Sequence, residues 1–198
     1  MPDPSGGEAL TVTAHVAALL ERLRVPYAVV GSLASSLHGI PRSTQDADVL
    51  AALEEHHVAA FVAALAGDFY VDDERARRAI ATGSSFNVIH LATMFKVDLF
   101  VPGADRFAAS ELARRERVDL ELADRGVVEL WFASAEDALL HKLAWYRLGG
   151  EASDRQWHDV LGVLRVRRSA LDDDYLGRWA RELGVVDLRE RAREAAAR

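Results

Sequence analysis

Three aspartates stand in runs that otherwise read as apolar strands. Asp46 and Asp48 lead directly into Val49-Leu50, and Asp98 lies inside the run 95–101. Residues two apart in a strand point to the same face, so the first two aspartates present their carboxylates side by side. If the strand of Asp98 is their neighbour, a third carboxylate joins them, and three such charges repel unless a cation lies between them. Oxygen ligands favour Mg²⁺ (or Mn²⁺) completed by substrate phosphates.

The dipeptide Gly31-Ser32 follows a short apolar run and could serve a phosphate. Glycine lets the backbone approach an anion closely, and Ser32 reads as the N-cap of a short helix that offers free N–H groups. Arg42 and Thr44 precede the aspartates and are candidates to meet the triphosphate, although a loop arginine is usually solvated. A Gly-Ser before a helix is common, so the dipeptide gains its meaning only from the three aspartates.

Lysine is rare in this chain: only Lys96 and Lys142 occur, whereas lysine and arginine together number 24. Lys142 lies in the apolar stretch 139–143, where a charge is unfavourable unless it points into a polar cleft. There it would act on phosphates as a compact point charge. The alternative is a lysine whose stem covers apolar surface while its head reaches water. Lys96 is equally well explained as a surface lysine retained by chance.

Composition limits the class of protein. The chain has 198 residues, half of them hydrophobic, a net charge of −7 and no cysteine. These values exclude a disulfide framework, a thiolate metal site and a broad nucleic-acid-binding surface, although a local basic patch could still serve an RNA end. No apolar run approaches a membrane span, and the polar N-terminus lacks the layout of a signal peptide. We therefore expect a cytoplasmic protein without membrane contact.

The expected elements divide the chain into an α/β half and a helical half. Apolar periodicity, caps and breakers predict helices at 8–24, 33–38, 54–65, 134–148, 154–166, 172–183 and 186–197. They predict strands at 27–30, 46–50, 85–91, 95–101, 117–122 and 127–132, the middle two forming a hairpin and the last two being edge strands around a turn at 124–126. The fold class is α/β (α+β), with a small mixed β-sheet flanked by helices and followed by a C-terminal helical bundle. We place the core at 1–133 and, at 134–198, a helical region that completes the nucleotide cleft.

The order of these motifs resembles a known superfamily. Val30-Gly31-Ser32, then the run 42–49 with its Asp-x-Asp, then Val97-Asp98-Leu99 is similar to the polymerase-beta-like nucleotidyltransferase superfamily. The helical stretch 136–143, with Arg147, Asp154-Arg155 and Asp159-Val160, resembles the bacterial AbiEii-like group, which includes toxins of toxin–antitoxin and phage-defence systems.

The resemblance implies a nucleotidyltransferase fold and assigns roles to residues. Asp46 and Asp48 match the metal-binding pair, Asp98 the third carboxylate, Lys142 the nucleotide-contacting lysine and Asp159 the acid that ends the last motif. The implied reaction transfers a nucleoside monophosphate from a nucleoside triphosphate to a hydroxyl of RNA or protein and releases pyrophosphate. A cognate toxin or antitoxin is a possible partner. The alternative is a catalytically silent, antitoxin-like binding module, and the retention of all three carboxylates favours the enzyme.

Overall fold

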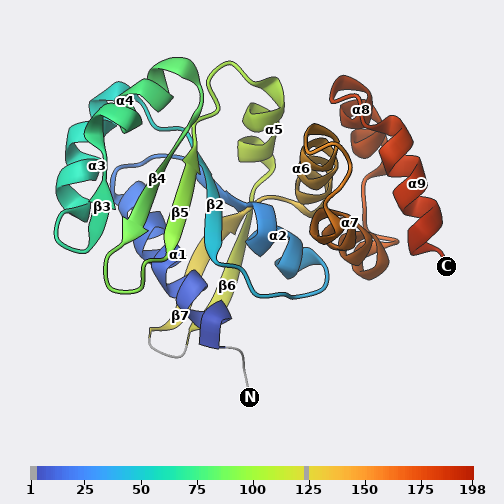
Figure 1. Cartoon of the computed structure of the whole chain (residues 1–198), viewed down its shortest axis with the longest axis horizontal. Coiled ribbons are helices and arrows are strands. Elements are labelled where there is room, and N and C mark those ends of the chain that lie inside the picture. Colours follow the sequence, from blue (N-terminus) through green and yellow to red (C-terminus); the bar gives the residue numbers. More distant parts are fainter. Residues whose placement is uncertain (1–3, 123–124) are drawn as a thin grey trace. The chain divides into compact units, whose positions relative to one another are not determined.

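A computed structural model describes residues 4–122 and 125–198, and these form two compact units (Figure 1). The first unit runs to Val30 and resumes from Ser43 to Phe132. The second comprises Gly31–Arg42 and Ala133–Arg198. A segment of the second unit thus begins at residue 133, and this unit also takes the short segment 31–42 from the first half of the chain.

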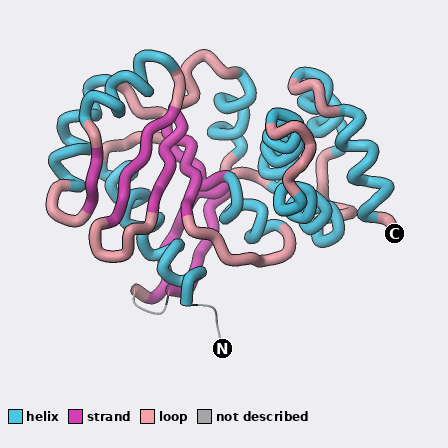
Figure 2. The backbone as a smooth tube through the Cα atoms, viewed as in Figure 1, coloured by secondary structure: helices cyan, strands magenta, loops and turns pink. Residues whose placement is uncertain are grey.

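The first unit contains a mixed seven-stranded sheet (Figure 2). Its strand order is β3-β4-β5-β2-β1-β7-β6. The pairs β1–β7 and β2–β5 are parallel, and the other four pairs are antiparallel. The strands are β1 (Tyr27–Val30), β2 (Asp46–Ala51), β3 (Phe69–Val71), β4 (Ser85–His90), β5 (Lys96–Phe100), β6 (Glu116–Leu122) and β7 (Gly126–Phe132). The predicted mixed sheet is confirmed.

One face of the central strands is apolar and the other carries polar groups. Val49, Val88 and Val97 alternate with partly exposed residues and are fully or almost fully buried. Phe61 packs edge-on against Phe86 on this apolar face, with ring centroids 6.2 Å apart. The helical elements of the unit are α1 (Pro4–Arg22), the 3₁₀ turn η1 (Glu55–His57), α3 (Val58–Leu65), α4 (Asp73–Thr82) and α5 (Arg106–Arg114).

Several elements differ from the sequence prediction. The strand β3 and the helices α4 and α5 were not predicted. The strand β7 is not an edge strand, because it pairs with β1 on one side and with β6 on the other. The predicted hairpin of β4 and β5 is confirmed, and Met94 closes it with its N–H donating to the carbonyl of His90. The turn predicted at 124–126 falls partly outside the described residues.

The second unit is helical. Its helices are α2 (Gly31–His38), α6 (Ala135–Leu148), α7 (Asp154–Arg167), α8 (Asp173–Glu182) and α9 (Val186–Ala196). Ser134 caps α6 by accepting a hydrogen bond from the backbone N–H of Asp137, as its position before two acidic residues predicts. The predicted helical bundle is confirmed, and its buried side chains include Leu139, Leu143, Val160, Leu176 and Leu188.

None of the described helices combines the length and the apolar character that crossing a bilayer requires.

Candidate functional site

The strands β2 and β5 bring the predicted aspartates together in the first unit. In their parallel register Asp48 lies directly opposite Asp98, and Asp46 lies opposite Lys96. The antiparallel register of β4 then puts Asn87 opposite Asp98 on its other side. These residues share the polar face of the sheet because their apolar neighbours along each strand turn to the other face. The predicted neighbourhood of the two strands is therefore confirmed.

Lys96 is the residue of this cluster that the sequence analysis did not assign. Its Nζ lies 2.7 Å from Oδ2 of Asp98. The hydrogen bond to Asp98 raises the pKa of Lys96, and the charges of Asp98, Asp46 and Asp48 add to this effect against partial burial of the ammonium. The ammonium thus neutralises negative charge where we expected a metal ion. The scarcity of lysine in the chain was the signal that pointed to it.

The carboxylate of Asp46 has a different environment from that of Asp98. Thr44 is buried, and its hydroxyl lies 3.1 Å from Oδ1 of Asp46 and 3.0 Å from the backbone carbonyl of the same residue. Asp46 is therefore fixed at the beginning of β2 by a side chain that we had expected to meet phosphate. The hydroxyl of Thr44 is directed to the carboxylate and the backbone carbonyl of Asp46.

The fit to a divalent metal is partial. The donors are carboxylate oxygens on one face of a sheet, which is the chemistry that Mg²⁺ prefers. Within residues 4–122 and 125–198, however, no group of three or more acidic, histidine or cysteine side chains is arranged to hold a metal ion. In this arrangement the carboxylate of Asp98 is paired with Lys96 and that of Asp46 with Thr44.

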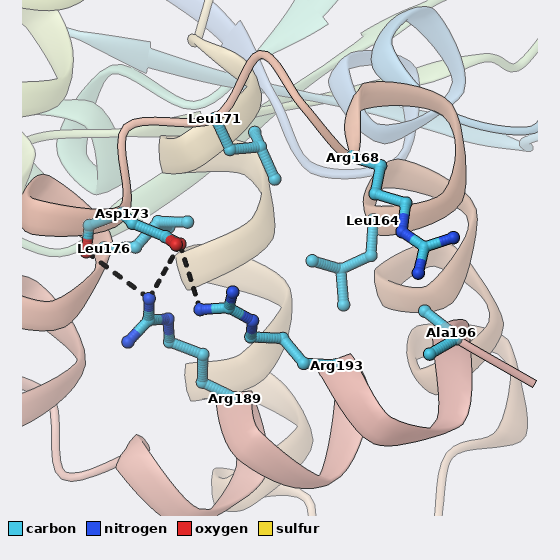
Figure 3. Close-up of a pocket in the computed structure, with 9 residues that line it drawn as sticks. Leu164, Arg168, Leu171, Asp173, Leu176, Arg189, Arg193 and Ala196 are labelled. Atoms are coloured by element: carbon cyan, nitrogen blue, oxygen red, sulfur yellow. Dashed lines mark hydrogen bonds and ion pairs between the residues drawn. The ribbon is translucent and has the colours of Figure 1, made fainter.

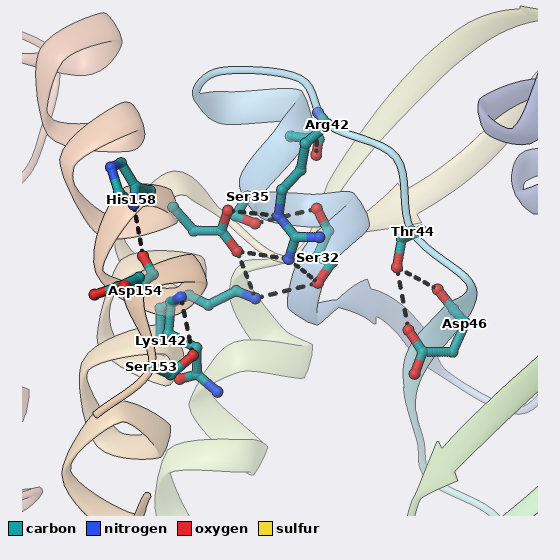
Figure 4. A network of polar contacts seen from close by, with 12 residues as sticks. Ser32, Ser35, Arg42, Thr44, Asp46, Lys142, Ser153, Asp154 and His158 are labelled. Carbon is teal, nitrogen blue, oxygen red and sulfur yellow. Dashed lines mark hydrogen bonds and ion pairs between the residues drawn. The ribbon is translucent and has the colours of Figure 1, made fainter. Parts of the chain in front are cut away.

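A second polar cluster lies inside the second unit and contains four predicted residues (Figure 4). Asp159 accepts hydrogen bonds from Nε and Nη2 of Arg42 at 2.8 and 2.9 Å. Lys142 Nζ lies 2.9 Å from Oδ2 of the same carboxylate. The hydroxyl oxygen of Ser32 accepts from Arg42 Nη2 at 2.6 Å and from Lys142 Nζ at 3.3 Å. Two cations therefore share one carboxylate and one hydroxyl.

Burial makes this cluster rigid. The side chains of Lys142 and Asp159 are 8% and 4% exposed, so Lys142 is not a lysine whose head reaches water. Burial by itself raises the pKa of Asp159, but the hydrogen bond from Arg42 and the charge of Lys142 outweigh it and hold that pKa below its ordinary value. Asp159 is therefore ionised at neutral pH and orients both cations. That it also contributes to nucleotide binding stays a prediction.

The start of α2 also differs from the prediction. The helix begins at Gly31, whose φ of 60° is left-handed and favours glycine. Ser32 is therefore inside the first turn and is not the N-cap. Its hydroxyl is directed to Arg42 and Lys142, so the dipeptide contributes a side-chain contact to the cluster.

A separate cavity of about 250 Å³ lies among α7, α8 and α9 of the second unit (Figure 3). Arg189 and Arg193 line it, and both donate to Oδ1 of Asp173, at 2.9 and 3.1 Å. None of the residues that line it is a predicted site residue. The arginines are already paired with a carboxylate, so we do not include this cavity in the candidate site.

Comparison with solved structures identifies the fold of the chain. No protein-family model matches the chain, and no curated protein sequence matches it either. Among solved structures, an antigenic nucleotidyltransferase-like protein from Paracoccidioides brasiliensis is 18% identical, with 98% of this chain and 94% of that chain covered and a TM-score of 0.57. A structure of ANT(2″)-Ia in complex with adenylyl-2″-tobramycin is 14% identical, with 88% and 95% covered and a TM-score of 0.53. The chain therefore has the nucleotidyltransferase fold.

Proposed function

We propose that the protein is a metal-dependent nucleotidyltransferase that transfers a nucleoside monophosphate from a nucleoside triphosphate to a hydroxyl group. The observation that carries this proposal is the register of β2 and β5, which sets Asp48 opposite Asp98 with Asp46 two residues away on the same face. Carboxylates rarely occupy adjacent sheet positions without a charge-related task. The fold gives independent support, since ANT(2″)-Ia was solved with an adenylylated product.

The proposed reaction assigns chemistry to the first unit. Asp46 and Asp48 would hold Mg²⁺ or Mn²⁺, which when bound would neutralise charge on the phosphates and activate the attacking oxygen. The acceptor oxygen forms a bond to the α-phosphorus while the bond from that phosphorus to the bridging oxygen of the β-phosphate breaks. Pyrophosphate leaves, and the proton of the acceptor hydroxyl passes to the carboxylate of Asp98.

The second unit contributes the groups that suit phosphate binding. Arg42 and Lys142 carry two positive charges against the single negative charge of Asp159, so the cluster has an excess charge of +1. A phosphate group bound by this unit would meet Arg42, Lys142 and the hydroxyl of Ser32, and the two cations are already oriented by Asp159. Asp159 is in this proposal a positioning residue.

The cellular setting belongs to the proposal as well. The helical motif that includes Lys142 and Asp159 resembles the AbiEii-like group, and a role in a toxin–antitoxin or phage-defence system follows as a hypothesis. The competing function is a nucleotide-binding module without transfer. Retention of Asp46, Asp48 and Asp98 on one sheet face favours the enzyme over this alternative.

The test is transfer of label from each α-labelled nucleoside triphosphate, with Mg²⁺, to total RNA or lysate. Asp48→Asn and Asp98→Asn should abolish labelling while circular dichroism shows folded protein. Asp119→Asn is the matched control. It makes the same chemical change at an exposed position of strand β6 in the same sheet. Binding of triphosphate without transfer by the parent protein would favour the binding module, and the absence of both would contradict the proposal.

A further inference from the structure

Asp46, Asp48 and Asp98 form a carboxylate row on one sheet face of the first unit. A second cavity, of about 190 Å³, adjoins this row. It opens beside α4 and β4 and has Asp98 as its acidic wall. This volume is below the range of about 300–1,000 Å³ typical of drug-sized ligands, so the cavity suits a small polar compound or the end of a larger one. Its lining residues are Arg75, Arg78, Ala79, Ser84, Ser85, Phe86, Asn87 and Asp98.

The sheet register makes Asp98 the common member of this cavity and the carboxylate row. On one side Asp98 faces Asp48 across the β2–β5 pair, and on the other it faces Asn87 across the β4–β5 pair. A group bound on the Asn87 side would therefore approach Asp98 from the side opposite to Asp48. In the proposed reaction this group would be the acceptor hydroxyl, which transfers its proton to Asp98.

The charge of the cavity is positive apart from Asp98. Arg75 reaches Asp72 only at 3.5 Å and is 72% exposed. Within the part of the chain that the structure describes, the guanidinium of Arg78 makes no ion pair. The next arginine of the helix is different, because Arg77 is bound to Asp73 and Glu55. The helix therefore presents two of its arginines to the cavity and commits the third to neighbouring acids.

Ser84 and Ser85 form one wall of the cavity, and the backbone before them is in close contact with another segment through Gly83 and Gly103. A Cβ at Gly83, whose φ is 60°, would lie 3.0 Å from the Cα of Gly103. Ser84 donates its N–H to the carbonyl of Ala79 and accepts from the N–H of Val101. Ser84 is thereby fixed between the end of α4 and the end of β5. The hydroxyl of Ser84 lies 2.8 Å from that of Thr82, and Ser85 is the next residue of the cavity lining.

We propose that this cavity is the acceptor subsite and that the acceptor is a hydroxyl compound carrying a phosphate, such as the ribose phosphate of an RNA end or a free sugar phosphate. The inference rests on the proposed nucleotidyltransferase function. Arg75 and Arg78 bind the phosphate, while Asn87 and the serines bind the sugar hydroxyls. The acceptor O–H bond breaks with its proton passing to Asp98, the oxygen bonds to the α-phosphorus, and pyrophosphate leaves with the electrons of the broken bond.

The test compares three probes as acceptors in the presence of α-labelled triphosphate and Mg²⁺. The probes are a short oligoribonucleotide with a free 3′ hydroxyl, ribose 5-phosphate and unphosphorylated ribose. Transfer to the first or the second, but not to ribose, is expected and distinguishes a polymer end from a free sugar phosphate. Transfer to ribose with equal efficiency, or preferential transfer to a cationic amino sugar or to protein hydroxyls, would overturn the inference.

Arginine variants then assign the phosphate contact. Arg75→Gln with Arg78→Gln should lower kcat/KM for the phosphorylated acceptor by about tenfold or more, because charge-assisted hydrogen bonds are lost, and leave the KM for the triphosphate unchanged. Arg77→Gln is the matched control on the same helix and should leave both values unchanged. If triphosphate binds and pyrophosphate is released but the double variant equals the parent, the inference fails and the proposed function stands. If the parent binds no triphosphate, both fail.

Discussion

The two lysines of the chain lie against aspartates, one in each unit. Lys96 binds Asp98 at 2.7 Å on a half-exposed strand, whereas Lys142 binds Asp159 at 2.9 Å in a buried cluster. The exposed pair can be broken at little cost because solvent screens it, but the buried pair cannot. Lys96 is therefore suited to give way to an incoming cation, and Lys142 is suited to stay in place.

Removal of Lys96 should make metal binding easier. Lys96→Met deprives Asp98 of its ammonium, so we expect the affinity for Mn²⁺ without nucleotide to rise on the order of tenfold. Electron paramagnetic resonance of free Mn²⁺ measures this without any turnover. Lys142→Met is the control, because it removes the other lysine, which is paired with Asp159 and Ser32 of the second unit, and we expect no change in Mn²⁺ affinity. An unchanged affinity in Lys96→Met would show that the ammonium does not compete with the metal.

The buried carboxylate of Asp159 should dominate the stability of its cluster. Asp159→Asn leaves Arg42 and Lys142 without their shared anion, which we expect to destabilise the protein by about 3–5 kcal/mol at neutral pH. The folded pKa of Asp159 lies below its ordinary 3.8. Its contribution is therefore fully present above about pH 3.8 and is lost as the pH falls through the lower, folded value.

Urea unfolding across this pH range measures the effect. The difference between the parent and Asp159→Asn should be constant from pH 7 to about pH 5 and shrink below about pH 3.8. Asp187→Asn is the control in the same unit, because Asp187 pairs with Arg147 at the surface and is 68% exposed. A difference that persists unchanged into acid would mean that the carboxylate charge does not stabilise the cluster.

Single residues were the most predictable level of the candidate site. Asp46, Asp48 and Asp98 stood out because carboxylates are unfavourable in apolar strands, and their register confirms that they are neighbours. The partners of these residues could not be predicted, because the contacts of Lys96 and Thr44 depend on strand register and side-chain orientation. The role of Asp159 as an acceptor for two cations depends on residues 117 and 17 positions away, which no local pattern encodes.

At the scale of elements, α2 and α7 approach each other at the backbone. A Cβ on Gly39 would lie 2.7 Å from the backbone N of Val163 and 2.9 Å from the carbonyl carbon of Gly162. Backbone atoms of a packed helix cannot move away as a flexible side chain can. The absence of a side chain at Gly39 thus permits the approach that brings Arg42 to Asp159 on α7.

Gly39→Ala should therefore destabilise the second unit. We expect overpacking to cost about 1–3 kcal/mol and to lower the melting temperature by several degrees. Gly177→Ala is the matched control, because its new Cβ would meet only the ends of Arg189 and Arg181 side chains, at 3.6 and 3.8 Å. Helix propensity should make that variant as stable as the parent or slightly more stable. Equal melting temperatures for Gly39→Ala and the parent would refute the close approach.

Two of the missed elements, β3 and α4, have weak local signals. The strand β3 has three residues, and its stability comes from pairing with β4, which is distant in sequence. The helix α4 buries only Ala76 and Ala79, so its apolar periodicity is faint among charged residues. The longer helices of the second unit bury large side chains at regular spacing and were predicted, with their ends displaced by at most one residue.

At the scale of the whole molecule, the sequence predicted the fold class but not the strand order. The parallel pairs β1–β7 and β2–β5 join segments far apart in the chain, and period-two alternation carries no information about such partners. The sequence also could not predict that residues 31–42 belong to the helical unit, because this depends on the packing of α2 against α6 and α7.

The net charge of −7 bears on how an anionic acceptor would bind. An acidic chain gives no broad attraction to a polyanion, so binding must come from local cations. The cavity beside Asp98 offers two, Arg75 and Arg78. Each phosphate contact to a single strand contributes a slope of about −0.7 to the plot of log affinity against log salt concentration. Two contacts give an expected slope between about −1 and −2 for a short oligoribonucleotide.

Fluorescence anisotropy of a labelled oligoribonucleotide, titrated from about 50 to 200 mM KCl, measures this slope. In Arg75→Gln with Arg78→Gln the slope should approach zero, because no phosphate contact is left to release counterions. Arg77→Gln should keep the slope of the parent, since its guanidinium is bound to Asp73 and Glu55. A slope of about −5 or steeper in the parent would require many more phosphate contacts than this cavity provides. Such a slope would mean that RNA binds a wider surface than this cavity. That surface would have to be basic, although the chain as a whole carries a net negative charge.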